Sequence, residues 1–265
     1  MKVLAFLWRD WLIESGYHLS FFLRWFGILF NVFVYYFLGR LMDTAVAPAL
    51  APYGGSYFAF ALVGIALNGY FSLGLSTFSS NLRQAQMTGT LEAMLMTPTR
   101  LSTFVIGSSL WDYVFTTLNV LVYLVVGALL GADVLRGNFT SALVVLVLSV
   151  ITFSAVGLFA ASVILVTKRG DPVTWVFNAV LTLLGGVFYP VEILPGYLQR
   201  IAAFLPVTYA LRGMRLALLK GYSLAALRRE VTILAVFAMV LAPLSLWAFR
   251  FALDLARREG SLAQY

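Results

Sequence analysis

Five stretches of this chain carry no charged side chain over close to, or more than, the ~20 residues that a helix needs to cross a bilayer. Charged residues make up only 11% of the chain, against roughly 25% in a soluble domain. The chain is therefore predicted to be an all-α integral membrane protein. The five charge-free stretches are Thr44–Leu82, Tyr113–Ala132, Gly137–Thr167, Pro172–Val191 and Val231–Phe249.

A sixth span is predicted over Phe21–Leu41. Arg24 and Arg40 lie near its ends, where long cationic side chains can reach the two membrane surfaces. With six spans, most of the Lys and Arg residues fall on the side of the N-terminus once the stretch from Arg200 onward is set aside. Because cytoplasmic loops are enriched in Lys and Arg, both termini are predicted to be cytoplasmic, in a multi-pass cell membrane protein.

The first 18 residues contain charges where the apolar core of a cleavable signal peptide would have to lie. Their apolar side chains recur at helical spacing, which predicts an N-terminal helix over residues 1–18. This helix either lies in the membrane interface or packs on the rest of the protein, and both readings place it flat at the cytoplasmic surface. Its apolar residues are Leu4, Leu7, Trp8 and Trp11.

The segment Leu183–Gly221 is apolar enough for a membrane but contains three prolines, Pro190, Pro195 and Pro206. Each proline lacks a backbone N–H and disfavours a helical conformation in the residue before it. One straight helix cannot pass through them, so the chain is predicted to bend here. Broken backbone at membrane depth is tolerated where protein or a water-lined cavity satisfies its polar groups, which makes the segment a functional candidate.

The longest polar interruption on the predicted cytoplasmic side covers residues 80–100. Within it, Leu91, Met94 and Leu95 recur at i, i+3 and i+4, which places three apolar side chains on one face of a short helix. That face packs either on a partner or back on the membrane surface.

Glycines recur within two of the predicted spans. Small residues allow helices to approach closely, although such spacings are common by chance in membrane helices. They predict close helix contacts only weakly. The residues are the GxxxG pair Gly127 and Gly131, and Gly64, Gly69 and Gly74.

The composition argues against catalysis and against binding of nucleic acid. The chain has no GxxxxGK[ST] phosphate loop, so it is not expected to hydrolyse ATP alone. It has no cysteine and one histidine, which leaves neither a thiolate nor a His-cluster metal site and no catalytic triad. Lys and Arg are dispersed at membrane edges, so the expected counter-ions are lipid headgroups.

Asp112 is the one acidic residue well inside an apolar region. Ionisable residues within spans often mark ion pathways, which would suit a secondary carrier. Alternatively, Asp112 marks the interfacial end of a shorter span that begins near Tyr113. The sequence shows no partner for this carboxylate.

Two motifs resemble the ABC-2 type permease family, the membrane subunits of ATP-driven drug, lipid and polysaccharide exporters. One is GTLEAMLMTPTR, Gly89–Arg100, which is similar to the family's G-T-[LI]-E segment followed by a proline. The other is the apolar three-proline segment, with its Gly-Gly pair and its LPVTY run. The length, the predicted span count and the missing ATPase motif also match.

The resemblance implies that the first motif docks on a nucleotide-binding subunit, which would bind ATP and Mg²⁺, with no cofactor in this chain. The apolar face of the short helix fits such a contact, and the N-terminal helix would form its second part. The implied coupling residues are Gly89, Thr90, Leu91, Glu92, Met94 and Leu95.

The resemblance also implies that residues 189–229 form a helical hairpin that re-enters from the outer side, between the fifth and sixth spans. This would explain both the prolines and the positive charge of that stretch. Its candidate functional residues are Gly185, Gly186, Tyr189, Pro190, Glu192, Pro195, Pro206 and Tyr209.

The expected function is therefore that of a non-catalytic permease in a single domain, residues 1–265. Two copies would form the pathway for export of a drug, a lipid or a lipid-linked glycan, and the partners would be the ATPase subunit and membrane lipids. The alternative is a secondary carrier that uses Asp112 for ion coupling. A membrane scaffold or sensor is a third possibility, but it leaves the three-proline segment unexplained.

Overall fold

The computed structural model describes residues 18–87, 101–134, 137–167 and 171–258. Within these ranges the regular secondary structure is entirely helical, as the sequence predicts. The helices are α2 (His18–Leu50), η1 (Ala51–Tyr53), α3 (Tyr57–Met87), α5 (Leu101–Leu129), α6 (Phe139–Thr167), α7 (Asp171–Leu184), η2 (Val191–Ile193), α8 (Gly196–Ala202), α9 (Pro206–Lys220) and α10 (Arg228–Arg258).

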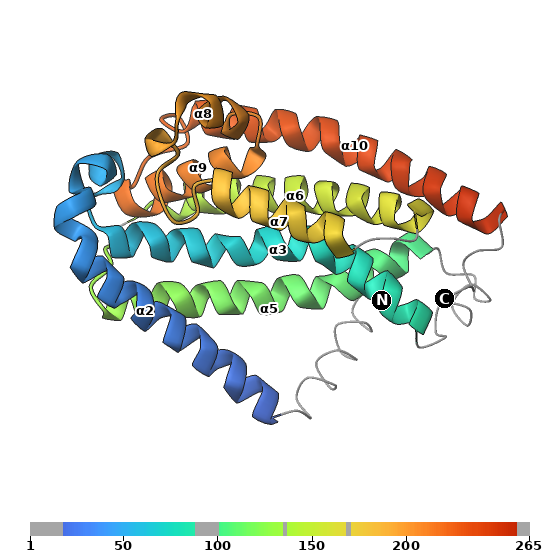
Figure 1. The fold of residues 1–265 in the computed structure, drawn as a ribbon, viewed down its shortest axis with the longest axis horizontal. Helices are drawn as coiled ribbons and strands as arrows, with labels where there is room; N and C mark the ends of the chain where they lie inside the picture. The colour runs from blue at the N-terminus through green and yellow to red at the C-terminus, as the bar shows by residue number, and fades with distance from the viewer. Residues whose placement is uncertain (1–17, 88–100, 135–136, 168–170, 259–265) are drawn as a thin grey trace.

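Helix α3 is the centre of the bundle. It packs against α2, α5, α6, α7 and α9, while α10 lies along α6. Figure 1 shows α3, α5, α6 and α10 running along the long axis, with α2 slanting away from them. The core is aromatic and aliphatic around α3, where the rings of Phe71 and Phe153 lie 4.3 Å apart between centroids. At one end of the bundle, called the η1 end below, η1, α8 and α9 lie together.

Five of the described helices are long and apolar enough to cross a membrane, namely α2, α3, α5, α6 and α10. A sixth crossing results if the bent pair α8 and α9 counts as one span. The predicted fifth span, Pro172–Val191, is shorter than expected. Helix α7 begins at Asp171, one residue before the predicted start of the span at Pro172, but has only 14 residues. At 1.5 Å per residue it is about 21 Å long, less than the ~30 Å of a hydrocarbon core.

The boundary between the first two spans was predicted wrongly. Helix α2 continues past Leu41 to Leu50, and the turn comes at η1, followed by Gly54 and Gly55 with φ of 108° and 80°. The second span is therefore α3, which begins at Tyr57 and not at Thr44. A count of charge-free residues cannot detect this turn, because the helix end and the glycine turn are both uncharged.

The third and sixth spans extend beyond their predicted limits. Helix α5 begins at Leu101 and passes through Asp112, and α10 covers Arg228–Arg258 instead of ending at Phe249. A helix does not have to stop where the first charged side chain occurs, because its ends can project into the polar membrane surface. Asp112 therefore lies inside a continuous helix.

The three prolines bend the chain as predicted. Pro190 precedes η2, Pro195 is the N-cap of α8, and Pro206 occupies the start of α9, where a missing N–H costs little. The axes of α8 and α9 meet at 88°. Such a bend suits a broken span or a re-entrant hairpin, and residues 185–221 are called the broken segment below.

Close helix contacts occur at some of the predicted glycines. At Gly74 an added Cβ would lie 2.7 Å from Cβ of Phe153, and at Gly157 it would collide with the carbonyl of Gly74, so α3 and α6 cross backbone to backbone. An added Cβ at Gly127 would collide with the side chain of Leu62, so α5 also lies close to α3 there. Gly131 makes no such contact; its φ of 96° shows that it forms the turn after α5.

Two predicted regions lie outside the described residues. They are residues 1–17 of the N-terminal helix and the coupling residues Gly89, Thr90, Leu91, Glu92, Met94 and Leu95.

Candidate functional site

The broken segment encloses a polar cavity of about 230 Å³ at the η1 end. Four of the residues predicted from sequence line it, namely Gly185, Pro190, Glu192 and Tyr209. This cavity is called the end cavity below. Its other lining residues come from η1, η2, α8 and its C-cap, α9 and α10: Tyr53, Val191, Gln199, Ala203, Thr208, Arg212, Arg215 and Arg229.

Arg215 holds the broken segment on α3. Its side chain is 3% exposed, and its guanidinium donates to the carbonyls of Phe60 (3.2 Å), Gly186 (2.7 Å) and Val187 (2.7 Å). The guanidinium carbon also lies 3.4 Å from the centroid of the Phe60 ring, a cation–π contact. The buried charge is thus stabilised by carbonyl dipoles and an aromatic face.

Two glycines make this arrangement possible. Gly186 has a φ of 79°, a conformation that favours glycine, and this turns its carbonyl and that of Val187 toward Arg215. On α3, a Cβ at Gly64 would collide with the carbonyl of Val187 and lie 2.6 Å from Nη2 of Arg215. The predicted Gly-Gly pair and one of the α3 glycines therefore serve the same junction.

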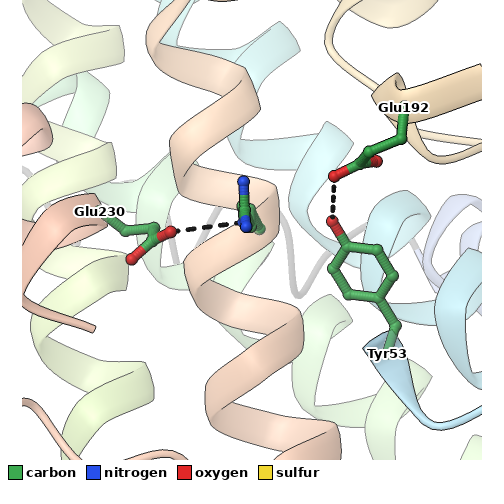
Figure 2. A network of polar contacts seen from close by, with 4 residues as sticks. Tyr53, Glu192 and Glu230 are labelled. Carbon is green, nitrogen blue, oxygen red and sulfur yellow. Dashed lines mark hydrogen bonds and ion pairs between the residues drawn. The ribbon is translucent and has the colours of Figure 1, made fainter. Parts of the chain in front are cut away.

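Two further polar contacts join elements across the end cavity (Figure 2). The Tyr53 hydroxyl donates to Oε1 of Glu192 at 3.1 Å, which ties η1 to η2. Arg212 of α9 forms an ion pair with Glu230 of α10, with 3.4 Å between Nε and Oε1. Burial and the neighbouring Glu192 raise the pKa of Tyr53 to about 12, so the phenol remains a hydrogen-bond donor at neutral pH.

The other predicted residues of the broken segment act around the cavity. The Tyr189 hydroxyl donates to the carbonyl of Leu183, and that of Tyr209 donates to the carbonyl of Ala203 at 2.9 Å. Pro195 and Pro206 start α8 and α9. These residues fix the path of the chain around the cavity, and among them Tyr209 also lines it.

Asp112 has partners that the sequence did not reveal. Thr77 of α3 donates to its Oδ2 at 2.6 Å, and Nδ2 of Asn81 lies 3.4 Å from the same oxygen. The carboxylate therefore joins α5 to α3 through a hydroxyl and an amide. It lies in the first turn of the part of α5 that is apolar enough to cross a membrane, Ser109–Leu129.

A row of small and polar residues follows one face of α3 within its membrane-crossing part. Asn68, Ser72 and Ser76 are spaced at i, i+4 and i+8, and Gly69 beside them is exposed although α3 is largely buried. These four residues are called the polar strip below. Thr182 of α7 lies 3.4 Å from Asn68 between side-chain oxygens, which places α7 along the strip.

Helix α2 lies on the same side of the molecule as α7. Tyr35 of α2 stacks on Phe188, just after α7, with ring centroids 5.9 Å apart. The i, i+4, i+8 spacing of the strip can be read from the sequence, although the prediction for α3 rested on its three glycines. Arg215 and Tyr53 carried no signal in sequence, because their partners are backbone carbonyls and a residue far away in the chain.

Comparison with known protein families agrees with this architecture. The family model for the ABC-2 type transporter matches residues 2–219, which is most of the chain. A search of curated proteins gives no match. The match covers α2, α3, α5 and α6, the polar strip and most of the broken segment, and it ends before α10. The family's membrane component is a permease that works with an ABC ATPase subunit. The chain therefore belongs to the ABC-2 type transporter family.

Proposed function

We propose that this chain is the permease subunit of an ABC exporter and that two copies of it enclose the translocation path. A separate subunit binds ATP and Mg²⁺ and hydrolyses the nucleotide. The cargo is a hydrophobic or amphipathic compound, such as a drug, a lipid or a lipid-linked glycan. The family match supports the transporter class. The polar strip and the broken segment support the position of the translocation path.

The polar strip on α3 is the observation that carries the proposal. Polar side chains inside a membrane are costly and usually face a pathway or a protein neighbour. Here Asn68, Ser72 and Ser76 lie in a membrane-crossing part of α3, with α7 and α2 alongside, and Gly69 among them is exposed. A second copy placed against this side would enclose the strip between two chains.

The broken segment suits the exit of such a path. We place the η1 end at the outer membrane surface and treat α8 and α9 as the re-entrant hairpin, with both termini cytoplasmic. The end cavity offers hydroxyl, amide and charged groups to the polar part of an amphipathic cargo. The contacts of Arg215 and Arg212 hold this region on α3 and α10, so movement between those helices would reshape it.

Coupling to the ATPase is assigned to Gly89, Thr90, Leu91, Glu92, Met94 and Leu95, together with the N-terminal helix. The apolar face of Leu91, Met94 and Leu95 would pack on the partner. A packed contact of this kind can transmit a change in the partner's shape to α3 and α5, whose sequences flank it.

The test is affinity purification of the chain expressed with its neighbouring reading frames in mild detergent. We expect a soluble protein with a Walker A motif to co-purify in equal amount. Replacing Leu91 and Leu95 with Asp should abolish this association, because the charges would be buried in an apolar contact. The matched control is Ala93→Asp, which lies on the opposite side of the short helix and should leave the complex intact.

Two results would overturn the proposal. One is a chain that purifies without any ATPase under conditions that preserve other membrane complexes. The other is an ATPase that binds wild type and the Leu91/Leu95 variant equally, which would move the coupling contact elsewhere. In the first case an ion gradient becomes the energy source, and Asp112 becomes the residue to test.

A further inference from the structure

The end cavity has a surplus of positive charge. Three arginines line it, Arg212, Arg215 and Arg229, together with one acidic residue, Glu192. The ion pair with Glu230 neutralises Arg212, which leaves two guanidinium groups and one carboxylate. Two positive charges against one negative charge give the walls of the cavity a surplus of one.

Arg215 is a buried cation with no carboxylate beside it. Among the described residues it forms no ion pair, and its three hydrogen bonds go to backbone carbonyls. Carbonyl dipoles lower the cost of burying a charge but do not cancel the charge. A guanidinium has five N–H groups, and these three bonds leave two of them over. An anion in the cavity would supply the missing counter-charge.

Arg229 of α10 is a second cation of the cavity without a counter-charge. The residue is exposed, and no ion pair or hydrogen bond joins its guanidinium to another residue in the part of the chain that the structure describes. It can therefore bind an anion without giving up a contact within the protein. Its neighbour Arg228 is also exposed but does not line the cavity.

The neutral polar side chains of the cavity already donate hydrogen bonds within the protein. The hydroxyls of Tyr53, Thr208 and Tyr209 and the amide of Gln199 each have an acceptor in the chain. The donors that remain for a ligand are N–H groups of arginines. Because these donors carry charge, they favour an anion with several acceptor oxygens over a neutral polar group.

The cavity lies at the level where two membrane-crossing helices begin. The membrane-crossing parts of α3 and α10 start at Tyr57 and Arg228. Tyr53 comes shortly before the first of these residues, Arg229 directly follows the second, and both line the cavity. The polar headgroups of lipids surround the hydrocarbon core at this level, so phosphate is an abundant anion there.

We propose that the end cavity binds the phosphate group of an anionic amphiphile, with Arg215 and Arg229 as its cations. The fork of N–H groups in arginine matches phosphate oxygens, and the single negative charge of a phosphodiester balances the surplus charge of the walls. The identity of this amphiphile as the cargo rests on the proposed function, whereas the binding itself does not. As the cargo site, the cavity would favour anionic lipids and lipid-linked glycans over uncharged drugs.

Glu192 opposes the binding of an anion, because its carboxylate lines the same cavity. Tyr53 donates to this carboxylate at 3.1 Å, and a glutamine would keep an oxygen for that hydrogen bond. Glu192→Gln should therefore tighten the binding of a phosphodiester by about threefold, since it removes a like charge. A purely structural role of Glu192 predicts no such gain.

The test is native mass spectrometry of the full chain in a nonionic detergent at low salt, titrated with dioctanoyl phosphatidylglycerol. This probe is a short-chain lipid with one anionic phosphodiester. Dioctanoylglycerol has the same acyl chains without the phosphate and should bind more weakly. Inorganic phosphate at the concentration of the lipid should not displace the most tightly bound lipid, because it lacks the acyl chains.

The decisive variant is Arg229→Gln, which should weaken the binding of phosphatidylglycerol by about fivefold, since water screens part of the interaction of an exposed arginine. The matched control is Arg228→Gln, which should bind like wild type because Arg228 does not line the cavity. Both residues are exposed, so both variants should fold.

Four results would each overturn the proposal. They are equal binding by the Arg228 and Arg229 variants, equal binding of the two lipids, weaker binding by Glu192→Gln, and displacement of the lipid by inorganic phosphate, which would indicate a site for free phosphate. Co-purification of the ATPase depends on a different region of the chain. An ATPase complex without lipid binding refutes this inference alone, whereas lipid binding without an ATPase refutes only the exporter function.

Discussion

At the scale of single residues, Arg215 shows how a charge is accommodated within this apolar chain. It faces three carbonyls and an aromatic ring, and its contacts join α9 to α3 and to the turn after α7. A lysine could not reproduce this arrangement, since its three donors sit on one nitrogen, whereas Arg215 donates from Nε, Nη1 and Nη2. The residue therefore fixes the position of the broken segment.

Arg215→Met should lower the free energy of unfolding by at least about 3 kcal/mol, because hydrogen bonds to a charged group contribute about 1.5–3 kcal/mol each. Chemical or thermal unfolding in detergent measures the change. Arg200→Met on exposed α8 is the control and should be nearly neutral. If the two variants have equal stability, Arg215 does not anchor the segment.

Asp112→Asn should retain transport and assembly. Asparagine keeps an oxygen that can accept from Thr77, and the side-chain contacts of Asp112 are with a hydroxyl and an amide. Transport by the reconstituted complex, together with its ATPase rate, checks this prediction. Loss of transport with an unchanged ATPase rate would instead favour an ion-coupling role for the carboxylate.

At the scale of elements, α3 combines three different surfaces. One face carries the polar strip, another lines a cavity of about 320 Å³ between α5 and α6, and its glycines allow close approach of α6 and of the broken segment. Its membrane-crossing part is accordingly mostly buried, unlike those of α2, α5 and α10. Helix α3 is therefore the element on which the other helices assemble.

Gly157→Ala should destabilise the protein by about 1–3 kcal/mol, because the added methyl group would force α6 away from the backbone of α3 at Gly74. Alanine is the better helix former, so the sign of the effect tests packing directly. Gly27→Ala on α2 is the control, since nothing lies within 4 Å of its added Cβ, and it should be neutral or slightly stabilising. Thermal stability in detergent distinguishes the two results.

At the scale of the whole molecule, the proposed homodimer makes each chain one half of the translocation path. The polar strip lies on the side of α3 where α2 and α7 pack, and Gly69 within it is exposed. Helix α2 slants away from the bundle (Figure 1). An exposed row of phenylalanines, Phe26, Phe30, Phe33 and Phe37, runs along it. A homodimer in which α2 and α7 of one copy face those of the other would cover both the polar strip and the exposed phenylalanines.

Disulfide crosslinking can test the homodimer cleanly because the chain contains no cysteine. Phe30→Cys on the exposed face of α2 should give a crosslinked dimer in native membranes after mild oxidation. Met239→Cys on the exposed face of α10 should stay monomeric, since that face is expected to contact lipid. Crosslinking of Met239→Cys alone would place the subunit interface on α10 instead.

The sequence alone determined the class of the protein and much of its outline. Long charge-free stretches require helices in a bilayer, because backbone polar groups there must be satisfied within the segment. Pro190, Pro195 and Pro206 fixed the bend, since their effect on the backbone is local. The family motifs indicated the transporter class, which the family match confirmed.

Only the tertiary structure decided where the helices end and which residues share a site. Leu50 and Gly54 are uncharged, so their turn left no trace in a count of charges. Arg215 meets Phe60 across 155 positions of sequence, and Tyr53 meets Glu192 across 139. Such contacts depend on how whole helices pack against one another. Local patterns of charge, proline and periodicity do not show which residues far apart in the sequence come together in the folded chain.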